Sequence, residues 1–253
     1  MPEFLGAQIR YVVSAIRYKD ESQSRERINQ AIDSILSTLK NESEKTILWQ
    51  ILNSMAYRGI AMAVWRGETF MWESLKKSEE IAVDLFSASK YEQVILKENL
   101  ITLYQTFYRT HLIHKQEREA LEYLKKMKDI DPYDSTLQLE EGLFYGDKGD
   151  YASALPHFIK AFELGPPGLG MSGYFAGVCC KNLNRLEDAE KWFLTSIEND
   201  ELSISSFLEL VEFYEKTAQM SKQSQIVNQI LTTESLKEQL EPHEIEALRK
   251  NSS

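Results

Sequence analysis

A chain of 253 residues with 43% hydrophobic and 27% charged residues has the composition of a folded globular protein and not of a disordered one. The longest stretch made only of apolar residues and glycine, residues 59–65, is far shorter than the roughly 20 residues that a membrane-spanning helix needs. The N-terminal segment is interrupted by Glu3, Gln8 and Arg10, which is not the pattern of a signal peptide. We therefore expect a cytoplasmic protein without a membrane partner.

The formal net charge of −10 is unevenly distributed along the chain. Residues 1–90 contain 12 Lys and Arg against 12 Asp and Glu, whereas residues 91–253 contain 17 against 27. An acidic body repels phosphate backbones, and the neutral N-terminal third shows no basic run. The charge distribution therefore predicts that nucleic acid is not a partner.

A repeat is the main signal in the sequence. Residues 151–162 place apolar side chains at helical spacing, with Ala154 as the small residue that allows two helices to approach closely. An alanine recurs 35 residues later at Ala189 and 34 residues earlier at Ala120, each within a similar apolar stripe. This period predicts three consecutive helix-turn-helix units.

These units resemble the tetratricopeptide repeat family. Residues 135–168 carry the fullest match, at Gly142, Tyr145, Gly149, Asp150, Tyr151, Ala154, Phe158, Ala161 and Pro166. The next unit matches at Gly177, Ala189 and Phe193, and the preceding unit at Ala120, Leu124 and Pro132. The resemblance implies an all-α fold, a right-handed α-solenoid of antiparallel helix pairs.

Weaker helical patterns flank the three units and bring the expected total to roughly twelve helices without a linker. The predicted organisation is a helical N-terminal region with a degenerate repeat-like pair, three repeats, and a degenerate pair with a C-terminal capping helix that starts at Pro242. In order, these are residues 1–90 (the pair at 44–88), 91–134, 135–168, 169–203 and 204–253.

The stretch from Gly168 to Gly173 fits the dinucleotide-binding pattern G-x-G-x-x-G. That pattern binds a pyrophosphate only when a β-strand precedes it and a helix follows. Here an amphipathic helix and Pro166-Pro167 precede it. We therefore interpret these glycines as residues that relax a turn between two repeats, and we expect no cofactor.

Few residues are candidates for chemistry. His111, His114 and Glu117 have the side chains of a zinc site, but no fourth ligand is evident, and a solvated histidine pair is the favoured interpretation. Cys179 and Cys180 are adjacent and fall in the middle of a predicted helix, where burial is favoured over a redox role. We predict no metal, no catalytic residue and no enzyme activity.

The family resemblance also implies where a partner binds. First helices of such repeats line a groove, and five positions in each usually point into it. Carried over to this chain, those positions are Gln105, Arg109 and Leu112, then Leu139 and Leu143, then Met171, Tyr174, Val178, Lys181 and Asn182.

The leading hypothesis is a non-enzymatic interaction module, a scaffold or assembly factor whose groove binds a peptide or protein segment. One alternative is a bacterial peptide-sensing regulator in which residues 1–90 form the output region. A third is an enzyme subunit on a helical scaffold. We also consider a homodimer through the exposed end of the stack, where an apolar face needs cover.

Overall fold

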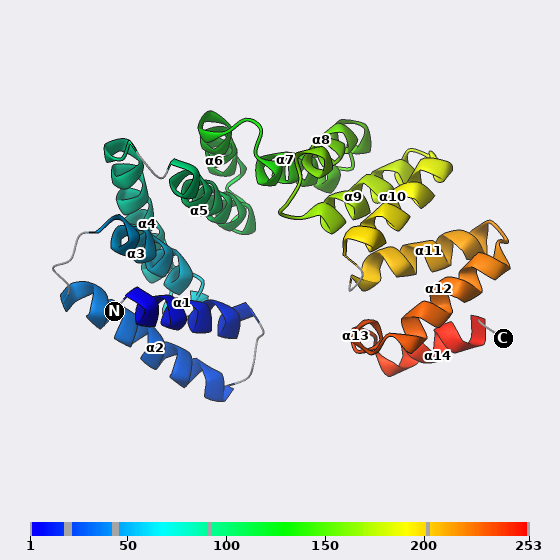
Figure 1. Ribbon diagram of the computed structural model, residues 1–253, viewed down its shortest axis with the longest axis horizontal. Helices are drawn as coiled ribbons and strands as arrows, with labels where there is room; N and C mark the ends of the chain where they lie inside the picture. The colour runs from blue at the N-terminus through cyan, green and yellow to red at the C-terminus, as the bar shows by residue number, and fades with distance from the viewer. Residues whose placement is uncertain (1, 18–21, 42–45, 91–92, 201–202, 252–253) are drawn as a thin grey trace. The chain divides into compact units, whose positions relative to one another are not determined.

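The computed structural model describes residues 2–17, 22–41, 46–90, 93–200 and 203–251, and these residues contain helices and no β-strand (Figure 1). The chain divides into two compact units, residues 1–132 and residues 133–253. Each unit consists of helices that pack in consecutive pairs, so the predicted all-α solenoid is confirmed.

Unit 1 begins with two helices that precede the first repeat-like pair. In the two pairs that follow, α3 contacts both α1 and α5, and α4 also contacts α5. The helices of this unit are α1 (Pro2–Arg17), α2 (Ser22–Asn41), α3 (Ile47–Ala61), the short 3₁₀ helix η1 (Val64–Arg66), α4 (Glu68–Ala88), α5 (Gln93–Ile113) and α6 (Glu117–Ile130).

Unit 2 contains the fullest repeats and ends in two short helices. Asp134 begins the unit's first helix, because its carboxylate accepts hydrogen bonds from the backbone N–H groups of Thr136 and Leu137. The helices are α7 (Ser135–Asp147), α8 (Tyr151–Leu164), α9 (Leu169–Asn182), α10 (Leu186–Asn199), α11 (Ile204–Lys216), α12 (Met220–Thr232), α13 (Glu234–Lys237) and α14 (Pro242–Asn251).

The alanines that mark the repeat are at the centre of the helix packing. Ala120, Ala154 and Ala189 are all 0% exposed. A small buried side chain lets two helices pack closely, which explains why alanine recurs with the period of the repeat.

The turn inside each repeat contains one residue with a positive φ angle, and this residue recurs with the period of the repeat. Lys115, Gly149, Asn184 and Ala218 have φ angles of 59°, 74°, 58° and 55°, in the left-handed region. These residues are 34, 35 and 34 positions apart. The period therefore continues through α11 and α12, which the sequence alone marks only as a degenerate pair.

A buried polar cluster links three helices of unit 1. The hydroxyls of Ser54 in α3 and Ser78 in α4 are 3.1 Å apart, and Asn99 in α5 donates to Ser54 Oγ over 3.2 Å. All three side chains are at most 8% exposed. Because a buried polar group is costly unless it is paired, this cluster favours one relative placement of the three helices.

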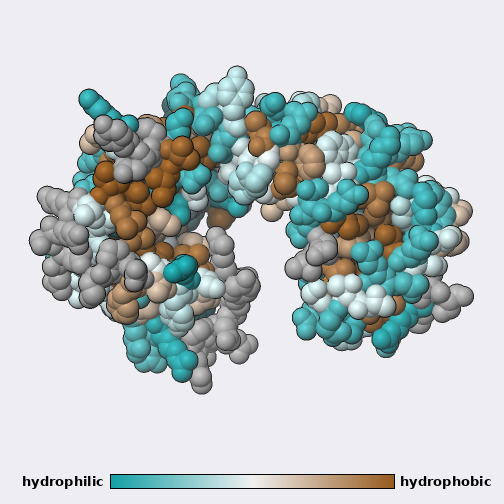
Figure 2. Space-filling model, viewed as in Figure 1, coloured by the Kyte–Doolittle hydropathy of each residue, from teal (hydrophilic) through white to brown (hydrophobic). Residues whose placement is uncertain are grey.

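Hydrophobic residues also reach the surface of unit 1. Figure 2 shows them gathered on the visible face of the unit over α3 and α4. Leu48 of α3 is 54% exposed and Val83 of α4 is 37% exposed. Among the described helices, none combines the length and the apolar character needed to cross a membrane.

Candidate functional site

A groove of about 690 Å³ runs along the helices α1, α3 and α5 of unit 1. Gly59 of α3 allows α1 and α3 to pack closely beside the groove, because a Cβ atom on Gly59 would lie only 3.2 Å from Val13 of α1. The lining residues come from three segments: Ile9, Arg10, Val13 and Ser14; Met55, Arg58, Gly59 and Met62; Thr102, Gln105, Thr106, Arg109, Thr110 and Ile113. We call this the unit 1 groove.

The unit 1 groove has an apolar part and a polar part. Ile9, Val13 and Met55 supply aliphatic surface, while the α5 side supplies three threonines. The threonine hydroxyls form a ladder, since Thr102, Thr106 and Thr110 each donate to the carbonyl oxygen four residues earlier. Their hydrogens are thereby used within the helix, and the oxygens remain as acceptors for a ligand.

Of the three groove residues predicted within residues 91–134, two line the unit 1 groove and one does not. Gln105 and Arg109 are in the lining, on the same face of α5 as the threonine ladder. Leu112 is half-buried and is not a lining residue. Arg10 and Arg58 were missed by sequence reasoning, because residues 1–90 show too little repeat pattern to align their first helices with the later ones.

The predicted groove residues of unit 2 are largely engaged in packing. Leu139 is 6% exposed and belongs to the hydrophobic core of the unit, against which Leu143, Tyr174 and Val178 are partly buried. Met171 is 47% exposed. Leu143 and Val178 do line a shared small pocket, of about 150 Å³. A role for these residues in partner binding stays a prediction.

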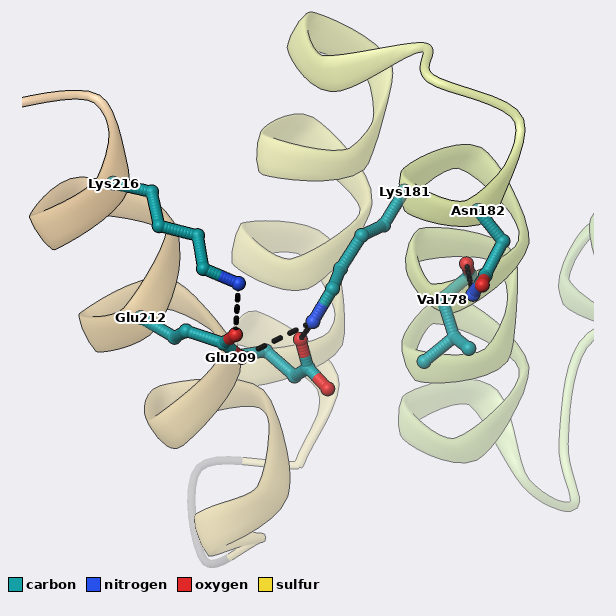
Figure 3. A network of polar contacts seen from close by, with 6 residues as sticks. All are labelled: Val178, Lys181, Asn182, Glu209, Glu212 and Lys216. Atoms are coloured by element: carbon teal, nitrogen blue, oxygen red, sulfur yellow. Dashed lines mark hydrogen bonds and ion pairs between the residues drawn. The ribbon is translucent and has the colours of Figure 1, made fainter.

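The cation predicted for the unit 2 groove is held by carboxylates. Lys181 Nζ lies 2.6 Å from Glu209 Oε2 and 3.1 Å from Glu212 Oε2, both on α11, and Glu212 also pairs with Lys216 (Figure 3). Burial alone would lower the pKa of Lys181, but the hydrogen bonds that Lys181 donates to the two glutamates raise it. Lys181 therefore joins two repeats.

The side chain of the neighbouring Asn182 also forms a hydrogen bond within the protein. Its side-chain amide donates to the carbonyl oxygen of Val178 in the same helix over 2.8 Å, as Figure 3 shows. The amide oxygen and the exposed position leave Asn182 accessible from solvent. Lys181 and Asn182 therefore bind different groups within the protein and do not converge on one point.

The glycine string has a different role from the predicted one. Only Gly168 is in the turn, with a left-handed φ of 91° at the start of α9. Gly170 and Gly173 are inside the helix, where an added Cβ atom would lie 2.4 Å from Asp200, which follows the end of α10, and 3.2 Å from Ser196 of α10, respectively. The interpretation of the string as a relaxed turn was therefore wrong for these two, which permit close helix packing.

The hydroxyl of Ser196 strengthens the same contact. Ser196 Oγ donates to the carbonyl oxygen of Gly170 over 2.7 Å and accepts from Ser206 Oγ over 2.8 Å. The serine stands where the repeat pattern has its last alanine. It connects α9, α10 and α11 by hydrogen bonds.

The two histidines pack on an aromatic residue and are not simply solvated. The ring centroids of His111 and His114 lie 4.7 Å and 5.7 Å from that of Trp72. His111 Nδ1 is 2.7 Å from Gln116 Oε1. In the described part of the chain, no group of three or more His, Cys, Asp or Glu side chains is placed to hold a metal ion.

The two cysteines are buried, in agreement with the favoured interpretation. Cys179 is 2% exposed and Cys180 is 0% exposed. Burial raises the pKa of the Cys179 thiol to about 12, and it also raises the pKa of Cys180. At neutral pH both side chains are thiols in a hydrophobic core.

Comparison with known proteins supports the fold. No family model matches the sequence, and no curated protein matches it. Among solved structures, PilW, described as a widely conserved type IV pilus biogenesis factor, is 15% identical, with a TM-score of 0.51 over 79% of this chain and 87% of PilW. Pseudomonas aeruginosa pilF is 13% identical, with a TM-score of 0.52 over 80% of this chain and 88% of pilF.

A third similar structure is YrrB, described as a TPR protein with an unusual peptide-binding site. It is 15% identical, with a TM-score of 0.47 over 78% of this chain and 92% of YrrB. At such identities the likeness concerns the fold. The tetratricopeptide-type α-solenoid predicted from residues 101–203 is confirmed at that level.

Proposed function

We propose that this protein is a non-enzymatic interaction scaffold that holds a peptide or an extended protein segment in the unit 1 groove. The observation that carries the proposal is the groove itself, because its volume of about 690 Å³ is that of a ligand site and three helices line it. Gln105 and Arg109, predicted as partner-binding residues from the repeat pattern, are both in its lining.

The chemistry of the groove suits a peptide. An extended chain presents backbone N–H groups, and the hydroxyl oxygens of Thr102, Thr106 and Thr110 can accept hydrogen bonds from them. Its apolar side chains can contact the aliphatic surface of Ile9 and Val13. Such a mixture of an apolar floor and fixed polar groups is typical of peptide recognition on a preformed surface.

The packing of the cysteine and histidine side chains supports the proposal that the protein is not an enzyme. The thiols of Cys179 and Cys180 are buried and carry raised pKa values. The rings of His111 and His114 pack against Trp72 in tilted arrangements. These side chains contribute to packing, and the groove is lined by none of them.

A peptide-display selection tests this function. The purified full chain is used to select binders from a random 12-residue library, and the dissociation constant of each selected peptide is measured by fluorescence anisotropy. The Thr106→Trp variant places an indole in the groove and is expected to abolish binding. The matched control is Thr69→Trp on α4, an exposed position outside the groove.

Selected peptides that bind the wild type and Thr69→Trp equally, and Thr106→Trp not at all, support the proposal. Selected peptides that bind all three proteins equally would show that the groove is not their site. Circular dichroism of both variants verifies that the helical fold is retained.

A further inference from the structure

The small pocket shared by Leu143 and Val178 is lined by residues of the helices α7, α8 and α9 in unit 2. Its lining also includes Asp147 of α7, Tyr151 of α8 and Phe175 of α9. Its volume is about 150 Å³, whereas sites for whole small molecules usually measure about 300–1,000 Å³. The pocket therefore has room for one side chain. We call it the unit 2 pocket, and we propose that it binds a lysine side chain of a basic partner segment.

Most of the unit 2 pocket is apolar. Phe158 and Cys179 are its most deeply buried lining residues, at 1% and 2% exposed. Leu143, Phe175 and Val178 are half-buried, and the rings of Phe158 and Phe175 stack with their centroids 5.2 Å apart. A lysine side chain has a four-carbon stem, which such a surface removes from water while the ammonium group stays near the opening.

Asp147 is the one charged residue in the described lining of the pocket. It is exposed, and among the described residues its carboxylate has no ion pair and no side-chain hydrogen bond. The next residue, Lys148, places its ammonium group 3.9 Å from the ring centroid of Phe144. Asp147 is also the last residue of α7, and the partial negative charge at the C-terminal end of a helix favours a cation as well.

The aromatic rings of the pocket add to its attraction for an ammonium group. Tyr151 and Phe175 are both partly exposed, and the face of an aromatic ring attracts a cation within about 6 Å of its centroid. Unit 2 already contains a lysine held in this way. Lys222 Nζ lies 2.7 Å from Glu190 Oε1 and 5.2 Å from the ring centroid of Tyr214.

The unit 2 pocket offers the same pair of groups without a lysine of its own. Asp147 supplies the carboxylate and Tyr151 supplies the ring and a hydroxyl oxygen that can accept a hydrogen bond. None of the described lining residues is Lys or Arg. A lysine of a partner therefore completes an arrangement that the chain itself uses elsewhere.

The charge of unit 2 favours a basic partner segment. Residues 133–253 contain 10 Lys and Arg and 20 Asp and Glu, whereas residues 1–132 contain 19 and 19. The whole excess of −10 is therefore in unit 2. Long-range attraction brings a basic segment to this unit, and the pocket then selects a lysine side chain. The unit 2 pocket and the unit 1 groove share no lining residue.

The first test measures peptide binding to the full chain. One labelled 12-residue peptide has lysine at every third position, and a second has norleucine there, which keeps the four-carbon stem and lacks the charge. Dissociation constants are measured by fluorescence anisotropy at low salt. Asp147→Asn removes the carboxylate charge and keeps the shape of the side chain. Glu198→Gln is the matched control, because it removes the same charge from an exposed position of α10 outside the pocket.

We expect Asp147→Asn to weaken binding of the lysine peptide about three- to fivefold, the effect of one partly exposed ion pair. Glu198→Gln should have a much smaller effect, because it removes only its share of the long-range attraction. Neither substitution should alter binding of the norleucine peptide. Circular dichroism verifies that both variants are folded.

The second test uses the wild type and so does not depend on the folding of a variant. A carbodiimide activates a carboxylate, and an amine in contact with it displaces the reagent as a urea and forms an amide. Mass spectrometry then identifies the carboxylates that are joined to the lysine peptide. We expect coupling to be enriched at Asp147 over exposed carboxylates such as Glu198.

Two results would overturn the inference: coupling at Asp147 no greater than at Glu198, or an effect of Asp147→Asn no greater than that of Glu198→Gln. A lysine peptide that Thr106→Trp excludes would bind in the unit 1 groove, which also overturns the inference but leaves the proposed function intact. Conversely, failure of the unit 1 groove to bind any peptide would leave coupling at Asp147 unaffected.

Discussion

Gly177 of α9 lies against the ring of Phe193 of α10, so closely that a Cβ atom on the glycine would be 2.6 Å from Phe193 Cδ1. The preceding repeat has the same relationship, because a Cβ atom on Gly142 would be 2.7 Å from Phe158 Cε1. The two glycines are 35 residues apart, so this contact is part of the repeat. Each glycine provides the space for the aromatic ring of the next helix.

Gly177→Ala should therefore destabilise the protein despite the higher helix propensity of alanine. The added methyl group must displace a fully buried phenylalanine ring, and overpacking of this kind costs about 1–3 kcal/mol. The measurement is the free energy of unfolding from chemical denaturation followed by circular dichroism.

Gly146→Ala is the matched control for Gly177→Ala. Gly146 is also inside a helix, but a Cβ atom there has no neighbour within 4 Å. We expect this variant to be as stable as the wild type or more stable by about 0.5–1 kcal/mol, from propensity alone. Equal effects of the two substitutions would contradict the role of Gly177 in helix packing.

Ala218→Gly should have the opposite effect to an ordinary alanine-to-glycine change. Ala218 has a φ of 55°, and a non-glycine residue in this region costs about 1–2 kcal/mol. Glycine relieves that cost, so we expect a net stabilisation of about 0.5–1 kcal/mol. Thermal unfolding should show an increased melting temperature.

The comparison for Ala218→Gly is Ala152→Gly on α8, at an exposed helical position. Here glycine has no conformational advantage, and a loss of about 0.5–1 kcal/mol is expected. A lower melting temperature for Ala218→Gly would contradict the prediction that the positive φ angle of Ala218 destabilises the folded state.

The two cysteines should resist alkylation in the native protein. With a pKa of about 12, only about one Cys179 side chain in ten thousand is a thiolate at pH 8, and the thiolate is the reactive form. We expect negligible modification by iodoacetamide at pH 8 and full modification after denaturation. Ser221→Cys, at an exposed position on α12, supplies a thiol that should react in the folded state. Rapid native alkylation of Cys179 would contradict its burial.

The Lys181 network predicts a loss of stability in acid. Hydrogen bonds from Lys216 and then from Lys181 lower the pKa of Glu212 below its ordinary value of 4.5. A carboxylate with a lowered pKa stabilises the folded state above its ordinary pKa, and this contribution disappears as the pH falls through the lowered value. The contribution is therefore complete above about pH 4.5.

Lys181→Met should be less stable than the wild type by about 0.5–1 kcal/mol at pH 7, the usual range for partly exposed ion pairs. The difference should shrink as the pH falls from about 4.5 through the lowered pKa of Glu212, because protonation of Glu212 removes its charge. Lys191→Met, at an exposed position on α10, should show no such dependence. A stability difference for Lys181→Met that is constant from pH 7 to pH 3 would contradict the network.

The periodic part of this fold was predictable from the sequence because its contacts are local. Ala120, Ala154 and Ala189 recur with the period of the repeat, and all three are fully buried. The left-handed residue was visible only at Gly149, where the sequence has a glycine. At Lys115 and Ala218 the surrounding helices impose the same φ on residues that do not signal it.

The candidate site was harder to predict because its residues are distant in sequence. Arg109 came from the repeat pattern, but Arg10 and Arg58 line the same groove from helices without that pattern. Lys181 was correctly placed on a first helix, yet its partners Glu209 and Glu212 belong to the next repeat and neutralise it. The glycines of α9 were misread since their effect depends on α10, a helix further along the chain.

Photo-cross-linking tests the central claim most directly. A peptide selected by the wild-type chain, with benzoylphenylalanine at one position, is irradiated in complex with the full chain, and the cross-linked residues are identified by mass spectrometry. Binding in the unit 1 groove predicts cross-links within residues 9–14, 55–62 and 102–113, and their loss in Thr106→Trp. Cross-links confined to residues 133–253 would contradict the assignment of the groove as the binding site.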